Sequence, residues 1–100
     1  MYKQQETKNA LKDWEKIKSM PKSARDKFKC LLVNILNNPR NLNSIGNPEQ
    51  LKYSEKEMWS RELTKKDRIV YGIEPGLYYS MPEEPEIVVF YQYLGHYQDK

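Results

Sequence analysis

Six polar side chains between residue 49 and the C-terminus could together carry out acid–base chemistry on a phosphate ester. They are a carboxylate, an imidazole, three cationic groups and a phenol, namely Glu49, His96, Lys52, Arg61, Arg68 and Tyr97. A carboxylate and an imidazole can act as general base and general acid, and lysine and arginine bind phosphate oxygens. Each residue also has an ordinary structural explanation, because histidines near a chain end are usually solvated and arginines often cover a polar sheet face. The pattern alone does not separate an active site from a polar surface.

Other common kinds of catalytic and binding site find no support in the sequence. One histidine and one cysteine cannot supply the three or four ligands that zinc needs, and no carboxylates have the spacing of a calcium loop. There is no glycine-rich phosphate loop and no serine in a strand-to-helix elbow for a catalytic triad. Cys30 lies in an apolar helical segment, so we expect a reduced, partly buried thiol rather than a nucleophile. We therefore expect chemistry without a metal or another cofactor.

Length and composition indicate one globular domain over residues 1–100, since 38% of the residues are hydrophobic and 31% are charged. No apolar run is long enough to cross a bilayer and no signal segment follows Met1, so we expect a cytoplasmic protein that does not insert into membranes. A net charge of +3 does not by itself indicate nucleic-acid binding. The cations that fall in the predicted sheet and its turn could nevertheless form a phosphate-facing patch; these are Lys52, Arg61, Lys65, Lys66 and Arg68.

Two amphipathic helices are predicted before residue 37. In residues 8–19 the apolar side chains of Leu11, Trp14 and Ile17 recur at intervals of three, and either Thr7 or Asn9 can cap the helix. A second helix is predicted over about residues 21–36, where apolar residues recur at three and four and a proline opens the first turn. We expect the two helices to be antiparallel neighbours. Residues 37–48 are rich in Asn, Pro, Gly and Ser and are predicted to form the main loop.

Three strands are predicted in the second half, over residues 58–64, 68–74 and 86–94, with a tight turn at 65–67 and a long connection at 77–85. Residues 2–7 either form a polar edge strand or no strand, because nothing apolar in them would anchor it. Arg61 and Arg68 alternate with apolar residues, so we expect both to point from one sheet face. Glu49 after Pro48 is typical of the first turn of a helix. The predicted fold class is α+β, with two N-terminal helices packed on an antiparallel sheet.

Four ordered sequence elements resemble the Txe/YoeB family of toxins in the RelE superfamily. They are residues 46–52 (GNPEQLK), 59–61 (WSR), 67–71 (DRIVY) and the near-terminal His96-Tyr97 pair. These elements are similar to the family's G-x-P-E-x-L-K, W-S-R, x-R-[IL]-V-Y and H-Y motifs in the same order. The chain departs from the family pattern in its polar N-terminus, in the insertion at residues 78–85 and in its extension beyond Tyr97.

The resemblance implies a fold like that of RelE and the microbial ribonucleases, and a toxin that cleaves messenger RNA on the ribosome. It implies that Glu49 is the general base, His96 the general acid and Arg68 the group that stabilises the transition state, with Lys52, Arg61 and Tyr97 as RNA contacts. It also implies a cognate antitoxin protein as a partner and leaves a homodimer open.

Metal-free RNA cleavage uses the 2′-hydroxyl of the substrate as the nucleophile, so a base, an acid and a cationic group are all needed. The residues carried over from the family fill these three roles. Two alternatives stay open at this stage. The same basic sheet could hold RNA or a protein without cleaving it, or the chain could be a structural interaction domain with no RNA role.

Overall fold

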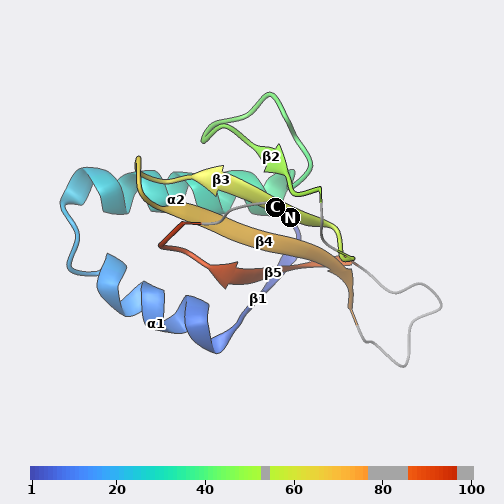
Figure 1. The fold of residues 1–100 in the computed structure, drawn as a ribbon, viewed down its shortest axis with the longest axis horizontal. Helices are drawn as coiled ribbons and strands as arrows, with labels where there is room; N and C mark the ends of the chain where they lie inside the picture. The colour runs from blue at the N-terminus through green and yellow to red at the C-terminus, as the bar shows by residue number, and fades with distance from the viewer. Residues whose placement is uncertain (53–54, 77–85, 97–100) are drawn as a thin grey trace.

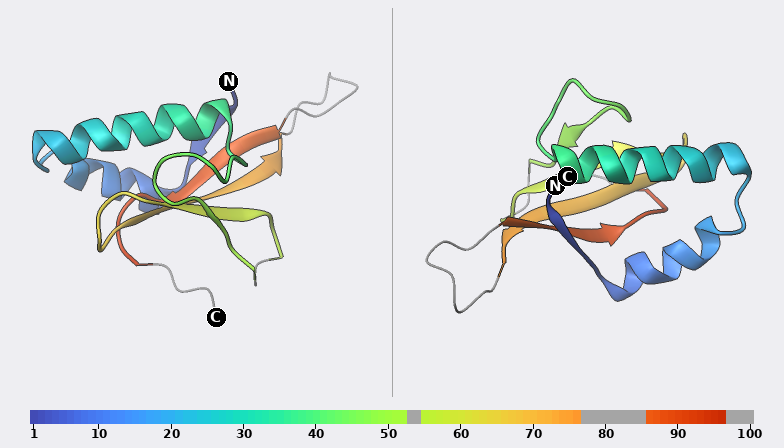
Figure 2. Two further views of the ribbon diagram at one scale, coloured as in Figure 1. Left: turned by 90° about the horizontal axis from the view of Figure 1, so that it is seen from above. Right: turned by 180° about the vertical axis from the view of Figure 1, so that it is seen from behind.

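The computed structural model describes residues 1–52, 55–76 and 86–96. These residues form a five-stranded sheet and two helices, arranged as Figure 1 shows. In chain order the elements are β1 (Lys3–Glu6), α1 (Lys8–Ile17), α2 (Lys22–Asn37), β2 (Glu49–Gln50), β3 (Met58–Glu62), β4 (Arg68–Pro75) and β5 (Glu86–Gln92). The strand order across the sheet is β1-β5-β4-β3-β2. Both helices cover one face of the sheet, and the chain after β5 leaves on the other side (Figure 2). The predicted α+β class with two helices ahead of the main sheet is confirmed.

The two helices pack their apolar side chains on the helix-covered face of the sheet. In α2 the buried residues Phe28, Leu31 and Ile35 lie at spacings of three and four, as predicted. The buried face of α1 is rotated relative to the predicted stripe, because Ala10, Asp13 and Ile17 are buried while the Leu11 residue is 49% exposed. Thr7 is the N-cap, since its Oγ1 accepts a hydrogen bond from the backbone N–H of Ala10 at 3.2 Å. The predicted partial burial of Cys30 was wrong, because this residue is exposed.

The main core fills the space between the helices and the sheet. Its sheet residues alternate along three strands, as expected for one buried sheet face, and are Trp59, Ile69, Tyr71, Ile73, Val88 and Phe90. A smaller cluster of Leu51, Met58 and Val70, with Tyr91 packed against it, lies on the open face. None of the helices in the described part of the chain has the length and apolar character needed to cross a membrane.

The N-terminal residues form the edge strand β1, which pairs in parallel with β5. The β3–β4 and β4–β5 pairs are antiparallel as predicted, and the short strand β2, which was not predicted, pairs antiparallel with β3. The prediction of an entirely antiparallel sheet was wrong, since the parallel β1–β5 pair makes the complete sheet mixed. Backbone hydrogen bonds fix β1 at both ends, from Tyr2 N–H to Leu36 O at 2.8 Å and from Thr7 N–H to Phe90 O at 3.0 Å. A strand without apolar side chains is therefore anchored by its main chain, which is why the side-chain pattern left this element undecided.

An ion-pair network links the chain after α2 to the residue before β3 and to the first residue of β5. The Arg40 guanidinium donates to both carboxylate oxygens of Glu57, at 2.7 and 3.0 Å, and to both of Glu86, at 3.0 and 2.6 Å. These hydrogen bonds lower the pKa of Glu57 and of Glu86 below the ordinary carboxyl value and raise the pKa of Arg40. Because a carboxyl with a lowered pKa in the folded state stabilises the fold only while ionised, this contribution is lost as the pH falls through that lowered pKa.

Replacing Arg40 with methionine is expected to destabilise the fold more at pH 7 than at pH 3. The side chains of Arg40, Glu57 and Glu86 are 37%, 31% and 44% exposed, so screening by water limits the expected loss at pH 7 to about 1 kcal/mol. Urea unfolding at the two pH values measures the difference. Lys18→Gln, which breaks the exposed pair with Glu15, is the control and should change little at either pH. An equal loss for Arg40→Met at both pH values would mean that packing, not charge, explains the effect.

Candidate functional site

Arg68 is the first residue of β4 and lies on the open face of the sheet. Its Nε donates to Ser60 Oγ on β3 at 3.0 Å, and its Nη2 donates to the backbone carbonyl of Asn47 at 3.3 Å. The side chain is 23% exposed. Two hydrogen bonds from different segments thus fix the guanidinium while part of it still faces solvent. A guanidinium held in this way can present its remaining N–H groups to an anion.

Glu49 comes next to Arg68 across the sheet. It is the first residue of β2 and lies directly opposite Ser60, the residue that orients the guanidinium. Its Oε2 is 3.7 Å from Arg68 Nη2, and its side chain is 59% exposed. The expectation that Glu49 begins a helical turn was therefore wrong, since the residue pairs in a short edge strand. The exposed carboxylate can accept a proton from a bound molecule.

The turn before Glu49 depends on an unusual backbone. Gly46 and Asn47 have φ values of 82° and 47°, in the left-handed region that glycine and asparagine tolerate best. A Cβ on Gly46 would lie 2.7 Å from Leu31 Cδ2, so the loop packs directly against α2. The Gly46 carbonyl also accepts a hydrogen bond from Glu62 N–H. This packing places the Asn47 carbonyl and Glu49 beside Arg68.

His96 reaches the same end of the sheet through the turn that follows β5. The backbone N–H of Arg68 donates to the Gly95 carbonyl at 2.9 Å, so His96 is the next residue after a direct main-chain link to Arg68. Gln92 Nε2 donates to the carbonyls of both Arg68 and Gly95, at 3.2 and 3.3 Å. His96 is exposed. Glu49, Arg68 and the backbone that carries His96 are therefore assembled at one end of the open face.

Arg61 is separated from these residues by the thickness of the sheet. It pairs with Ile69, whereas Arg68 pairs with Glu62, so the two arginines point to opposite faces and the prediction that they share a face was wrong. Arg61 is fully buried, and its guanidinium donates to Asn34 Oδ1 at 2.8 Å and to the Ile45 carbonyl at 3.1 Å. It binds the loop that leads to Glu49 instead of facing a phosphate.

The two remaining predicted site residues are placed differently. Lys52 is exposed and follows β2 by two residues, in a hollow of about 490 Å³ that is also lined by Gln50 and Lys56. It thus lies on the same short segment as Glu49, further along the chain. Tyr97 lies outside the described residues, as does the insertion at 78–85.

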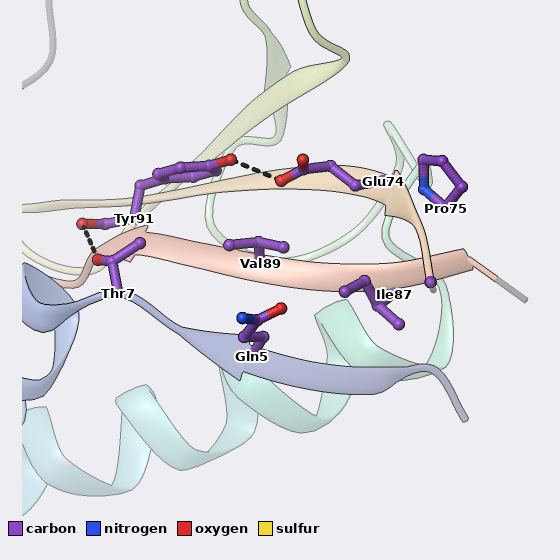
Figure 3. Close-up of a pocket in the computed structure, with 8 residues that line it drawn as sticks. Gln5, Thr7, Glu74, Pro75, Ile87, Val89 and Tyr91 are labelled. Carbon is purple, nitrogen blue, oxygen red and sulfur yellow. Dashed lines mark hydrogen bonds between the residues drawn. The ribbon is translucent and has the colours of Figure 1, made fainter. Parts of the chain in front are cut away.

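A second hollow on the sheet surface lies toward the opposite end of β4, at Glu74, Pro75 and Gly76 (Figure 3). It has a volume of about 620 Å³ and is lined by residues of β1, β4 and β5, including Glu74 and Tyr91. The Tyr91 hydroxyl donates to Glu74 Oε2 at 2.5 Å. Burial and the nearby carboxylate raise the pKa of this tyrosine. The phenol is therefore held protonated and already bonded. Of the five predicted site residues that the structure describes, none lines this hollow.

The assembled groups are suited to proton transfer beside an anion. The Glu49 carboxylate lies beside the Arg68 guanidinium, which Ser60 and Asn47 orient, and the backbone before His96 is bonded to the main chain of Arg68. Across the ranges 1–52, 55–76 and 86–96, no group of three or more histidine, cysteine or acidic side chains is gathered in a way that would hold a metal ion.

Comparison with known proteins gives consistent results. The family model described as a YoeB-like toxin of bacterial type II toxin-antitoxin systems matches residues 6–93. A YoeB/ParE toxin from Agrobacterium tumefaciens is 26% identical, with a TM-score of 0.74, and the match covers 95% of this chain and 99% of that one. The YoeB dimer of Staphylococcus aureus is 24% identical, with a TM-score of 0.70 over 96% and 98% of the two chains. The YoeB-YefM heterotetramer from Staphylococcus aureus is 23% identical, with a TM-score of 0.70 over 97% and 99%. A search of curated proteins gave no match.

Proposed function

This chain belongs to the family of YoeB-like toxins of bacterial type II toxin-antitoxin systems, and on that basis we propose that it is an endoribonuclease that cleaves messenger RNA on the ribosome. The observation that carries the proposal is the meeting of Glu49, Arg68 and the His96 segment at one end of the open sheet face. Since its substrate would be a message under translation, the protein would act in the cytoplasm.

The proposed reaction needs a base for the 2′-hydroxyl proton, an acid for the leaving 5′-oxygen and a cation for the charge on the phosphate oxygens. Glu49 accepts the proton of the substrate 2′-hydroxyl, and the 2′-oxygen attacks the adjacent phosphorus. The bond from phosphorus to the 5′-oxygen breaks, and His96 donates a proton to that leaving oxygen. The products are a 2′,3′-cyclic phosphate and a free 5′-hydroxyl. DNA cannot react in this way because it lacks the 2′-hydroxyl.

Arg68 would stabilise the negative charge that builds up on the non-bridging phosphate oxygens. Its Nε and Nη2 are held by Ser60 and Asn47, whereas Nη1 makes no hydrogen bond within the described residues. A donor that is fixed before the reaction loses little freedom when the transition state forms, and this preorganisation makes it effective. Lys52 and Tyr97 would contribute further RNA contacts. For Arg61 we propose a structural role in holding the loop before Glu49.

The partners proposed for this chain are messenger RNA on the ribosome and a cognate antitoxin. The solved relatives include a YoeB dimer and a YoeB-YefM toxin-antitoxin complex from Staphylococcus aureus, which supports a protein antitoxin and also self-association. An acidic antitoxin segment would be drawn to the cationic groups of the open face, such as Lys52 and Arg68. We propose that it covers this face, so that RNA and antitoxin compete.

The proposed function is tested by incubating the purified protein with translating ribosomes and mapping the 5′ ends of the message. We expect discrete new 5′ ends with free hydroxyl groups, and none when the nucleotide before the cut carries a 2′-deoxy sugar. His96→Ala is the control and should abolish most of the new ends. New ends that are as abundant with His96→Ala as with the wild type would contradict the role of His96, and the absence of new ends with either protein would contradict ribonuclease activity. Retention on the ribosome without any new ends would instead favour a non-catalytic RNA-binding module.

A further inference from the structure

A carboxylate with no assigned role is buried directly behind the segment that carries His96. Asp13 lies on the buried face of α1 and is 7% exposed. One of its oxygens, Oδ2, accepts hydrogen bonds from the backbone N–H groups of both Tyr93 and Leu94, at 3.0 and 3.2 Å. No cation forms an ion pair with Asp13 in the part of the chain that the structure describes. Burying an acid without a counter-charge is costly, so its hydrogen bonds must offset the cost.

A second carboxylate binds the next amide of the same turn. The N–H of Gly95 donates to Asp67 Oδ1 at 2.8 Å, while Asp67 Oδ2 accepts from the hydroxyl of Thr64 at 2.8 Å. The three amides that precede His96 are thus all bound by acidic side chains, two by Asp13 and one by Asp67. Gly95 has a φ of 101°, a conformation that L side chains rarely adopt, and this lets the turn bring its N–H and its carbonyl to Asp67 and Arg68.

His96 depends on this turn for its position. The residue is exposed, so packing does not fix its imidazole, and its location follows from the backbone that leads to it. That backbone is held on one side by α1, through Asp13, and on the other by the residues at the start of β4. The helix is itself fixed to the end of β5, since Thr7 Oγ1 donates to the Tyr91 carbonyl at 3.1 Å.

We propose that Asp13, together with Asp67, is a positioning residue for His96, so that helix α1 is part of the catalytic apparatus although it lies on the far face of the sheet. This inference rests on the proposed role of His96 as the general acid. If position 13 served only to pack α1 on the sheet, an apolar side chain there would extend the buried stripe of Ala10 and Ile17. The acid instead sets the distance from His96 to the leaving oxygen, and small displacements of a catalytic group cost large factors in rate.

The test is a double-mutant cycle between Asp13 and His96, with cleavage measured on translating ribosomes. We expect Asp13→Ala to lower kcat at least about tenfold with KM changed less than about twofold, because substrate binding is untouched while proton donation is misplaced. In the His96→Ala background the same substitution should change the residual cleavage less than about twofold. Asp13→Asn should recover most of kcat, since one amide oxygen can accept both N–H groups.

A second readout does not depend on cleavage. His96 is the single histidine of the chain, so its imidazole signals in an NMR spectrum are unambiguous. They should shift in Asp13→Ala and in Asp67→Ala. They should stay unchanged in Ile17→Ala, a control that removes a buried side chain of α1 without a bond to the His96 segment. If Asp13→Ala does not fold, a cycle between Asp67→Ala and His96→Ala replaces the first one. Asp67→Ala should then lower cleavage in the wild type but change the residual cleavage of His96→Ala by less than about twofold.

The outcomes separate the two proposals. If His96→Ala loses cleavage but Asp13→Ala and Asp67→Ala each reduce it by the same factor with and without His96, the positioning role is wrong and the proposed function stands. If Ile17→Ala lowers cleavage and shifts the imidazole signals as strongly as Asp13→Ala, general destabilisation explains the effect and the positioning role is again wrong. If His96→Ala cleaves like the wild type, the role of His96 in the proposed function is wrong, and the positioning role is wrong with it.

Discussion

Replacing His96 with glutamine is expected to lower cleavage of ribosome-bound message by about 10²- to 10⁴-fold, the usual loss when a general acid is removed. Glutamine can still donate a hydrogen bond but cannot transfer a proton to the departing 5′-oxygen. Single-turnover rates of the two proteins on ribosome-bound message test this expectation.

The matched variant for this experiment is Glu49→Gln, which removes the proposed base from the same site. It should lose a similar factor, because the 2′-hydroxyl then has no carboxylate beside it to accept its proton. Both side chains are exposed, so neither substitution should change the unfolding midpoint appreciably. Equal single-turnover rates for His96→Gln and the wild type would refute the assignment of His96.

The apolar residues made most of the fold predictable from sequence. Spacings of three and four indicated the two helices, and runs of β-branched and aromatic residues indicated β3, β4 and β5, because these patterns report which face of an element is buried. The edge strand β1 left no such signal. Its residues Lys3–Glu6 are polar, and it is fixed by backbone hydrogen bonds and by Glu6, which accepts from the Tyr93 hydroxyl at 2.6 Å.

The misplacement of Arg61 shows how register decides which side chains meet. Residues directly opposite each other in a strand pair share a face, and the observed pairing joins Arg61 to Ile69. A turn over residues 65–67, as predicted from sequence, would instead have paired 61 with 71. Both pairings put Arg61 among odd-numbered residues of β4, on the face opposite Arg68. Alternation along the hairpin therefore places Arg61 and Arg68 on opposite faces in either register. The prediction missed this because it considered only that each arginine alternates with apolar residues.

The role inferred for Asp13 had a weaker sequence signal. Residues 10, 13 and 17 form a stripe at helical spacing as good as that of Leu11, Trp14 and Ile17, but the prediction followed the apolar residues, and the stripe through residue 13 contains an acid. The buried face of the helix includes Asp13 because its carboxylate accepts a hydrogen bond from the backbone N–H of Tyr93, 80 residues away in sequence. Every residue type except proline has such a backbone N–H group, so the sequence does not indicate which one will bind the acid.

Substitutions of Arg68 test most directly how the site stabilises the charge on the phosphate, because both the orientation and the partners of this side chain are defined. Ser60 Oγ and the Asn47 carbonyl bind two of its nitrogens, and Glu49 lies beside it. A lysine at this position could keep the positive charge near Glu49. It could not bond Ser60, Asn47 and a phosphate oxygen with fixed geometry, since an ammonium is a point charge on a flexible stem.

Arg68→Lys is therefore expected to fold normally and to lose at least about tenfold in the cleavage rate, and Arg68→Ala about 10²- to 10³-fold, mainly in kcat rather than in KM. Ser60→Ala is the matched variant, because it keeps the guanidinium and removes only the bond that orients Nε; a loss between the wild type and Arg68→Lys is expected. Rapid-quench kinetics on programmed ribosomes measures all three variants, with circular dichroism as the check on folding. If folded Arg68→Lys turns over like the wild type, charge alone is enough at this position, and a role for the fork geometry in the transition state must be given up.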